Sequence, residues 1–290
     1  MRSNIFAILL VCFFPLTVYP QKGEEKVKVS VTILPVAGFV ENVGGERVEV
    51  MVMIPPGANP HTYEPAPEQL KRLSESRLYV KVGSGIEFEL SWLDKLISLN
   101  PQMYICDASR GIELIYPDSA GSKCERCGRR ADPHIWLSPL KAMKMVENIR
   151  DALIEVDGGG REYYSRNSED YIERLRKLHK YIKKRLKDLK GETFMVFHPA
   201  WKYFAREYGL KEKAAESEGK SLTPAELISL ITYAKKNGID KIFVSPQFNR
   251  KSAEVIAGEV NARVVSIDPL AKDYIENLAE MADILAGDRK

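Results

Sequence analysis

The residues in this chain that are best suited to carry out chemistry are three of its four histidines and one aspartate: His61, His134, His198 and Asp268. Three neutral imidazoles and one carboxylate make a four-coordinate set that suits Zn²⁺ in tetrahedral geometry. The set would tolerate Mn²⁺, which prefers more oxygen ligands. Each residue alone has a plainer interpretation, because loop histidines are often surface or capping residues and Asp-Pro after a strand is a common turn. The four together favour a metal site.

The positions of these residues support the same interpretation. His198 and Asp268 directly follow apolar runs with strand character, and His61 follows such a run across a Pro/Gly loop. His134 lies in Asp-Pro-His-Ile-Trp, just before a helical pattern. In open α/β sheets, ligands bind beyond the carboxyl ends of the strands. Because each half of the chain contributes two of the four residues, we expect the site to lie between the halves.

Apolar runs alternate with helical patterns along most of the chain. Runs typical of buried strands occur at 27–34, 48–54, 78–82, 194–197, 241–245 and 263–267. Helical segments separate these runs, which predicts an α/β fold with mostly parallel sheets and helices on both faces.

One stretch interrupts this alternation. Residues 161–189 contain neither Gly nor Pro, and Leu, Ile and Tyr recur there at helical spacing. This pattern predicts a helix about 40 Å long, which would act as a rigid strut between two lobes. The predicted division of the chain is a signal peptide at 1–20, an N-terminal lobe at 27–160, the linking helix at 161–190 and a C-terminal lobe at 191–290.

The N-terminus has the pattern of a secretory signal. Arg2 precedes an apolar run at 5–18, and a polar stretch follows from Gln21. The run is short for a membrane span, which needs about 20 apolar residues, although an uncleaved anchor stays open as an alternative. We therefore expect secretion across the cytoplasmic membrane, to a periplasmic or cell-surface location.

The charge balance points away from nucleic acid. The 43 Lys and Arg residues nearly balance the 40 Asp and Glu residues, for a formal net charge of +3, and the two signs are interspersed. Such a pattern is typical of an ordinary solvated surface. We expect no nucleic-acid partner, and we expect a monomer.

Five segments, in order along the chain, resemble one known family. They are Pro-Gly-Ala-Asn-Pro-His61-Thr-Tyr-Glu-Pro, Asp-Pro-His134-Ile-Trp-Leu-Ser-Pro, Phe-His198-Pro-Ala-Trp-Lys-Tyr-Phe-Ala-Arg-Glu-Tyr-Gly-Leu, Ile-Phe-Val-Ser245-Pro-Gln-Phe and Ser-Ile-Asp268-Pro-Leu. The chain is similar over about residues 28–285 to the periplasmic metal-binding proteins of zinc and manganese ABC transporters, the ZnuA/TroA-like group. Each segment alone would be weak, but together they are highly specific.

The resemblance implies two pseudo-symmetric α/β lobes and one metal in the cleft, held by His61, His134, His198 and Asp268. A histidine at the third of these positions leans toward zinc in this family, where other members carry glutamate. The chain departs from the family at Ser245, where an acidic residue is common. The acidic residue that the family carries at this position is not a direct metal ligand. The departure therefore leaves the ligand assignment unchanged and affects only the groups that surround the ligands.

The implied function is capture of a divalent metal, zinc above all, and its delivery to an ABC permease. A manganese-selective binding protein and a metal-binding surface adhesin remain alternatives. A zinc hydrolase fits less well, because three histidines and one aspartate close a tetrahedral shell and leave no position for an activated water. The chain also contains no His-Glu-x-x-His motif. We therefore expect no enzymatic activity.

Three cysteines, Cys106, Cys124 and Cys127, and the fourth histidine, His179, have less defined roles. Cys124 and Cys127 occupy the loop before Asp-Pro-His134, where the family often carries a metal-collecting insertion. A disulfide between them, a transient contact with soft metal ions and free thiols without a role all remain open. Cys106 is expected to be a small buried hydrophobe, and His179 a surface residue of the long helix.

Overall fold

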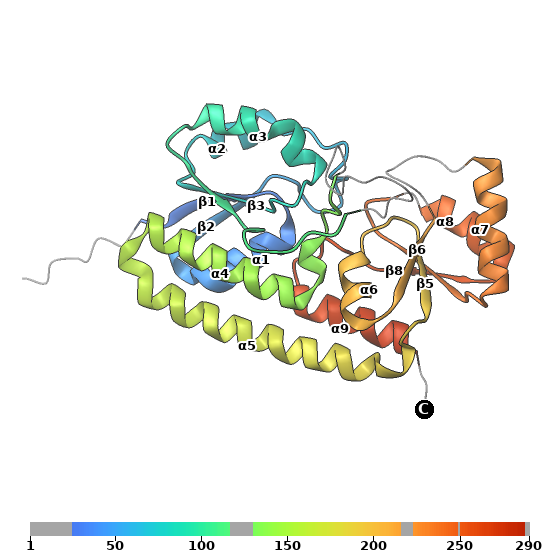
Figure 1. Ribbon diagram of the computed structural model, residues 1–290. Helices are drawn as coiled ribbons and strands as arrows, with labels where there is room; N and C mark the ends of the chain where they lie inside the picture. Colours follow the sequence, from blue (N-terminus) through green and yellow to red (C-terminus); the bar gives the residue numbers. More distant parts are fainter. Residues whose placement is uncertain (1–24, 117–129, 216–222, 249, 288–290) are drawn as a thin grey trace, which may run out of the picture.

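The computed structural model describes residues 25–116, 130–215, 223–248 and 250–287. Across these ranges the strands form two four-stranded sheets in which every pairing is parallel. The two lobes lie next to each other, and one long helix, α5 (Arg161–Arg185), runs along both (Figure 1). The predicted fold class is confirmed. No helix in these ranges combines the length and the apolar character that a membrane crossing requires.

The two sheets share one strand order, which makes the lobes pseudo-symmetric. The N-terminal sheet has the order β2-β1-β3-β4 and the C-terminal sheet the order β6-β5-β7-β8, so the first strand of each lobe lies inside its sheet. The strands are β1 (Val27–Val31), β2 (Val48–Val52), β3 (Leu78–Lys81), β4 (Tyr104–Asp107), β5 (Thr193–Val196), β6 (Lys211–Ala214), β7 (Lys241–Val244) and β8 (Arg263–Ser266). Because parallel strands end at the same edge, the loops that follow them gather there.

Sequence patterning identifies three strands in each lobe, and the structure adds a fourth to each. The added strands, β4 and β6, are edge strands. β6 reads Lys-Glu-Lys-Ala, with two of its four side chains exposed, and Tyr104 of β4 is also exposed. β6 is short and charged and carries no apolar run, so periodicity does not reveal it.

Helices cover the sheets of both lobes (Figure 1). They are α1 (Leu34–Gly44), α2 (Pro67–Leu73), α3 (Glu87–Leu99), α4 (Pro139–Val156), α6 (Lys202–Tyr208), α7 (Pro224–Lys236), α8 (Arg250–Val260) and α9 (Tyr274–Ala286), with short 3₁₀ turns η1 (Gly45–Arg47), η2 (Ile135–Leu137), η3 (Gly158–Gly160) and η4 (Lys187–Leu189). With helices against it, the inner strand β1 is buried on both faces: Val27, Val29 and Val31 on one face and Ser30 on the other are almost fully buried.

The long helix α5 joins the two lobes as expected, although it ends earlier than the sequence predicts. It stops at Arg185, and η4 replaces the last predicted turn. One stripe of α5 is buried, including Tyr164, Tyr171 and Leu178. The helix packs on α1 and α4 of the N-terminal lobe and on α9 of the C-terminal lobe. A helix of 25 residues spans about 37 Å, enough to bridge both lobes.

The hydrophobic core also continues from one lobe into the other. A single buried cluster contains strand residues of the N-terminal lobe together with Trp136 of η2, Phe204 of α6 and Tyr274 of α9. The Tyr274 hydroxyl donates a hydrogen bond to the carbonyl oxygen of Trp136 at 2.6 Å. The lobes are therefore joined by packed side chains as well as by α5.

Candidate metal site

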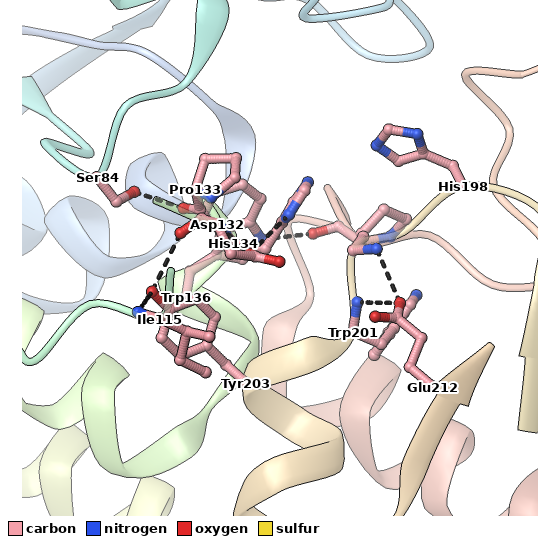
Figure 2. A network of polar contacts seen from close by, with 12 residues as sticks. Ser84, Ile115, Asp132, Pro133, His134, Trp136, His198, Trp201, Tyr203 and Glu212 are labelled. Carbon is pink, nitrogen blue, oxygen red and sulfur yellow. Dashed lines mark hydrogen bonds and ion pairs between the residues drawn. The ribbon is translucent and has the colours of Figure 1, made fainter. Parts of the chain in front are cut away.

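The structure brings the three predicted histidines together between the lobes. His61 lies in the loop after β2, His198 lies two residues after β5, and His134 immediately precedes η2. The imidazole centroids of His61 and His198 are 5.0 Å apart, and those of His134 and His198 are 5.7 Å apart. The three rings line one small cavity. Figure 2 shows His134 and His198 with the residues that support the segments around them.

The closest nitrogen pair has the spacing that a tetrahedral metal ion requires. His61 Nε2 and His198 Nε2 are 3.4 Å apart. Two nitrogens bound to one zinc ion at about 2.0–2.1 Å in tetrahedral geometry are separated by about 3.3–3.4 Å. The cavity they line has a volume of about 20 Å³, room for roughly one water-sized particle. The site thus suits a single ion.

A carboxylate orients the ring of His61. Glu87, the first residue of α3, places Oε2 3.3 Å from His61 Nδ1. Burial opposes ionisation of Glu87, but the hydrogen bond and charge interaction with His61 outweigh it, so the pKa of this carboxyl lies below its ordinary value. A carboxylate at Nδ1 keeps the proton on that nitrogen and turns the lone pair of Nε2 toward the other histidine.

His134 has an equivalent partner close by in the chain. Asp132 Oδ1 lies 3.1 Å from His134 Nδ1 and also accepts the backbone N–H of His134 at 3.0 Å. Burial disfavours the ionised Asp132, yet the His134 interactions prevail and lower the pKa of the carboxyl. Tyr203 of α6 donates to the Asp132 carbonyl at 3.1 Å, and Ser84 donates to the Pro133 carbonyl (Figure 2). The segment that carries His134 is therefore fixed from both lobes.

His198 is held by stacking and by the backbone that follows it. It is 5% exposed, and the Phe248 ring stacks on it at 4.2 Å between centroids. Glu212 of β6 accepts the backbone N–H groups of Ala200 and Trp201 at 3.0 and 2.8 Å. Burial raises the pKa of Glu212, while these two N–H groups act in the opposite direction. Phe248 also lines the cavity, so this stacking fixes the plane of the His198 ring there.

Asp268 lies at the edge of this cluster, two residues after β8. Its Oδ1 accepts hydrogen bonds from the Leu270 N–H at 2.9 Å and from Gln247 Nε2 at 2.8 Å. Gln247 and Leu270 line the cavity, whereas Asp268 is not among the lining residues. Within the described ranges, no three His, Cys, Asp or Glu side chains are arranged to hold a metal as they stand. The structure thus assembles the imidazoles and places the carboxylate next to them without closing a shell.

Several neighbours of the cavity were not assigned from the sequence. Asp132 had a local signal, because it stands two residues before His134. Gln247 and Phe248 belong to a segment that resembles the family, but the resemblance assigned them no role. Glu87 had no signal beyond being acidic at a helix start, because its contact with His61 joins the start of α3 to the loop after β2.

The other sequence expectations have mixed outcomes. Cys124 and Cys127 lie outside the described residues, as does the predicted signal peptide. Cys106 is buried, as expected, and burial raises the pKa of its thiol to about 12. The expectation for His179 is wrong. Its side chain is 18% exposed, and its Nδ1 contacts Glu207 Oε1 at 2.8 Å, so it lies between α5 and α6 rather than on the open surface.

Comparisons with known proteins identify the family of the chain. Residues 29–287 match the family described as zinc-uptake complex component A, periplasmic. The chain is 29% identical to the high-affinity zinc uptake system protein ZnuA of Bacillus subtilis, over 85% of this chain and 79% of that protein. It is 28% identical to the zinc-binding lipoprotein AdcA of Streptococcus pneumoniae, over 92% of this chain but only 55% of AdcA.

Solved structures show the same fold. The crystal structure of a ZnuA superposes with a TM-score of 0.83 at 38% identity, covering 90% of this chain and 98% of that one. Zn(II)-bound AdcA from Streptococcus pneumoniae superposes with a TM-score of 0.75 at 28% identity, covering 90% of this chain and 57% of that one. Two pseudo-symmetric lobes, a long linking helix, three converging histidines and a match over nearly the whole chain have one common explanation: this chain belongs to the family of zinc-uptake complex component A, periplasmic.

Proposed function

We propose that this protein captures Zn²⁺ outside the cytoplasm and delivers it to an ABC permease. The proposed ligands are Nε2 of His61, His134 and His198 and one carboxylate oxygen of Asp268. Each lobe contributes two ligands, so a bound ion would bridge the lobes. Membership of a family of periplasmic zinc-uptake components and the relatives named for zinc support this proposal.

The observation that carries the proposal is the 3.4 Å separation of His61 Nε2 and His198 Nε2. Glu87 and Asp132 contact Nδ1 of His61 and His134, which leaves the Nε2 atoms of these two rings available as ligands. Imidazoles bind metal only when neutral, so capture releases protons at acidic pH. Release to the permease then requires only that one lobe's pair of ligands move away from the other pair.

The direct test is a zinc titration of the purified protein with elemental analysis. We expect one tightly bound zinc per chain, and we expect His198→Ala to abolish tight binding. His179→Ala is the matched control, because it also removes a histidine, but one that lies outside the cavity. Wild-type protein without stoichiometric zinc, or equal losses in the two variants, would refute the proposal.

Manganese is the second candidate cargo. The chain is 27% identical, over 88% of its length, to the manganese ABC transporter substrate-binding lipoprotein PsaA of Streptococcus anginosus. The carboxylates of Glu87 and Asp268 near the rings could serve a metal that prefers oxygen. We favour zinc, because three of the four proposed ligands are imidazoles. Competition between the two metals distinguishes these cargoes.

We also propose that the protein is a carrier rather than an enzyme. A complete shell of three imidazoles and one carboxylate has no open position for a reacting water. Hydrolysis of an ester or peptide that His198→Ala abolishes would overturn this part of the proposal.

A further inference from the structure

Gln247 lines the cavity together with the three histidines, and its amide is unusual there. Its Nε2 donates to Asp268 Oδ1 at 2.8 Å. Its Oε1 is buried and has no hydrogen-bond partner among the described residues. Buried amide oxygens are normally paired, so an unpaired one needs a physical reason.

The reason lies in the partner of the other amide atom. A carboxylate oxygen accepts hydrogen bonds, and only the NH₂ group of a glutamine side chain donates them. Rotating the amide to pair Oε1 elsewhere would turn an oxygen toward the Asp268 carboxylate or break the contact. The hydrogen bond to Asp268 therefore sets the orientation of the Gln247 amide, and in this orientation Oε1 has no donor among the described residues.

This contact determines how Asp268 can bind a metal. Oδ1 accepts from both Gln247 Nε2 and the Leu270 backbone N–H, at 2.8 and 2.9 Å. A carboxylate oxygen has two lone pairs in its plane, and these two donors occupy both. Asp268 can then offer a metal Oδ2 but not both oxygens together.

Binding through one oxygen favours one kind of ion. Zinc in a set of N and O ligands is satisfied by four donors and takes a single carboxylate oxygen, whereas manganese prefers more oxygen donors. We propose that Gln247 is a specificity-determining positioning residue, which holds Asp268 as a single-oxygen ligand and so biases the site toward zinc over manganese. This inference rests on the proposed function and adds a residue that sets its selectivity.

The test uses Gln247→Met, which keeps the length of the side chain and removes both amide groups. Affinities for Zn²⁺ and Mn²⁺ are measured by competition with a chromophoric chelator, and the Co²⁺-loaded protein is examined by visible absorption. We expect zinc binding to weaken, manganese binding to hold or strengthen, and the zinc-to-manganese affinity ratio to fall by about tenfold. The cobalt bands should lose intensity, because a second oxygen from Asp268 raises the coordination number.

Asn277→Ala is the matched control. Asn277 Nδ2 donates to the backbone carbonyl of Asp268 at 2.8 Å, so its loss loosens the same residue without freeing Oδ1. We expect this variant to weaken both metals equally and to leave the cobalt spectrum unchanged. An unchanged ratio in Gln247→Met, or an equal change of the ratio in both variants, would overturn the assignment.

Two further outcomes keep the inference separate from the function. If Gln247→Met does not fold, as judged by circular dichroism, Gln247→Leu takes its place, because it also lacks the amide donor and brings no group that could donate to Asp268 or bind the metal. The same fall in the ratio is expected, and an unchanged ratio overturns the assignment. Wild-type protein that fails to bind zinc refutes the proposed function itself, whereas normal wild-type binding with an unchanged ratio in the variant refutes only the role of Gln247.

Discussion

The indole N–H of Trp136 donates to the carbonyl oxygen of Pro269 at 2.7 Å, across 133 residues of chain and across the boundary between the lobes. Trp136 lies two residues after His134, and Pro269 directly follows Asp268. One buried hydrogen bond therefore ties the segment of a proposed ligand in the N-terminal lobe to the segment of a proposed ligand in the C-terminal lobe. The distance between these two ligands is set by packing before any metal arrives.

Replacing Trp136 with Phe tests the contribution of this hydrogen bond separately from that of ring packing. The variant keeps an aromatic ring but leaves the Pro269 carbonyl unpaired, so we expect unfolding to become easier by roughly 1–3 kcal/mol. Zinc affinity should fall as well, because the spacing of His134 and Asp268 is no longer fixed. Chemical denaturation and zinc titration measure the two effects. Trp92→Phe, at a partly buried tryptophan outside the cavity, should leave zinc affinity unchanged, and a drop there would argue against this explanation.

Glu87→Ala should weaken zinc binding without removing a proposed ligand. Loss of the carboxylate 3.3 Å from His61 Nδ1 frees the ring to rotate and to move its proton to Nε2. Partners of this kind typically contribute about 10–100-fold to metal affinity, and we expect a loss in that range in a chelator competition assay. Glu75→Ala is the control, because Glu75 pairs with Lys28 on the surface. If both variants bind zinc as the wild type does, Glu87 does not orient His61.

Zinc affinity should decline as pH falls. A free histidine ordinarily titrates near pH 6.5, and a protonated imidazole cannot act as a ligand, so protons compete with the metal. We expect dissociation constants measured between about pH 7.5 and about pH 5.5 to rise steeply, since three imidazoles take part. Affinity that is constant across this range would exclude a site built mainly from histidines.

Asp132→Asn should change how the unfolding free energy of the metal-free protein depends on pH in the acidic range. The folded state lowers the pKa of Asp132 from 3.8, despite burial, through its interactions with His134. A lowered carboxyl pKa contributes stability that is present above the unfolded value and is lost as pH falls through the folded value. The wild type should therefore exceed the variant by roughly 1–3 kcal/mol above about pH 4, and the difference should shrink on further acidification.

Urea denaturation of both proteins across this pH range measures the difference. Because other buried carboxyls titrate in both proteins, only the difference between the two curves reports on Asp132. A difference that grows toward low pH would show the opposite linkage and contradict the interaction with His134.

His179→Ala should affect stability and leave the metal site intact. His179 contacts Glu207 Oε1 at 2.8 Å and the Tyr208 hydroxyl at 3.2 Å, and Ser138 also donates to Glu207. Without His179, the nearly buried Glu207 loses its partner on α5, and we expect a loss of roughly 1–3 kcal/mol in unfolding free energy. Arg176→Ala, at an exposed position of the same helix, should cost less than about 0.5 kcal/mol. Equal losses would show that the contact with Glu207 stabilises nothing.

Much of the architecture could be predicted from local pattern alone. The apolar runs of six strands, the edge strands β2 and β8 among them, and the long helix could be recognised from the sequence pattern. The edge strand β6 could not be found this way, since two of its four side chains face solvent and it carries no apolar run. His179 shows the same limit, because two flanking lysines suggest a solvent face while the packing of α6 covers the ring.

The sequence by itself determined which residue types the proposed site contains. Histidines and an aspartate stand beyond strand ends in both halves, and parallel strands must end at the same edge of a sheet. Tertiary structure alone decided which atoms of those residues are available. Glu87 and Asp132 contact Nδ1 of two imidazoles, Gln247 and Leu270 occupy one oxygen of Asp268, and the lobes hold two Nε2 atoms 3.4 Å apart. The contacts of Glu87 and Gln247 join separate segments within one lobe, and the distance between His61 and His198 spans the two lobes, so these distances are set only by the packing of the folded chain.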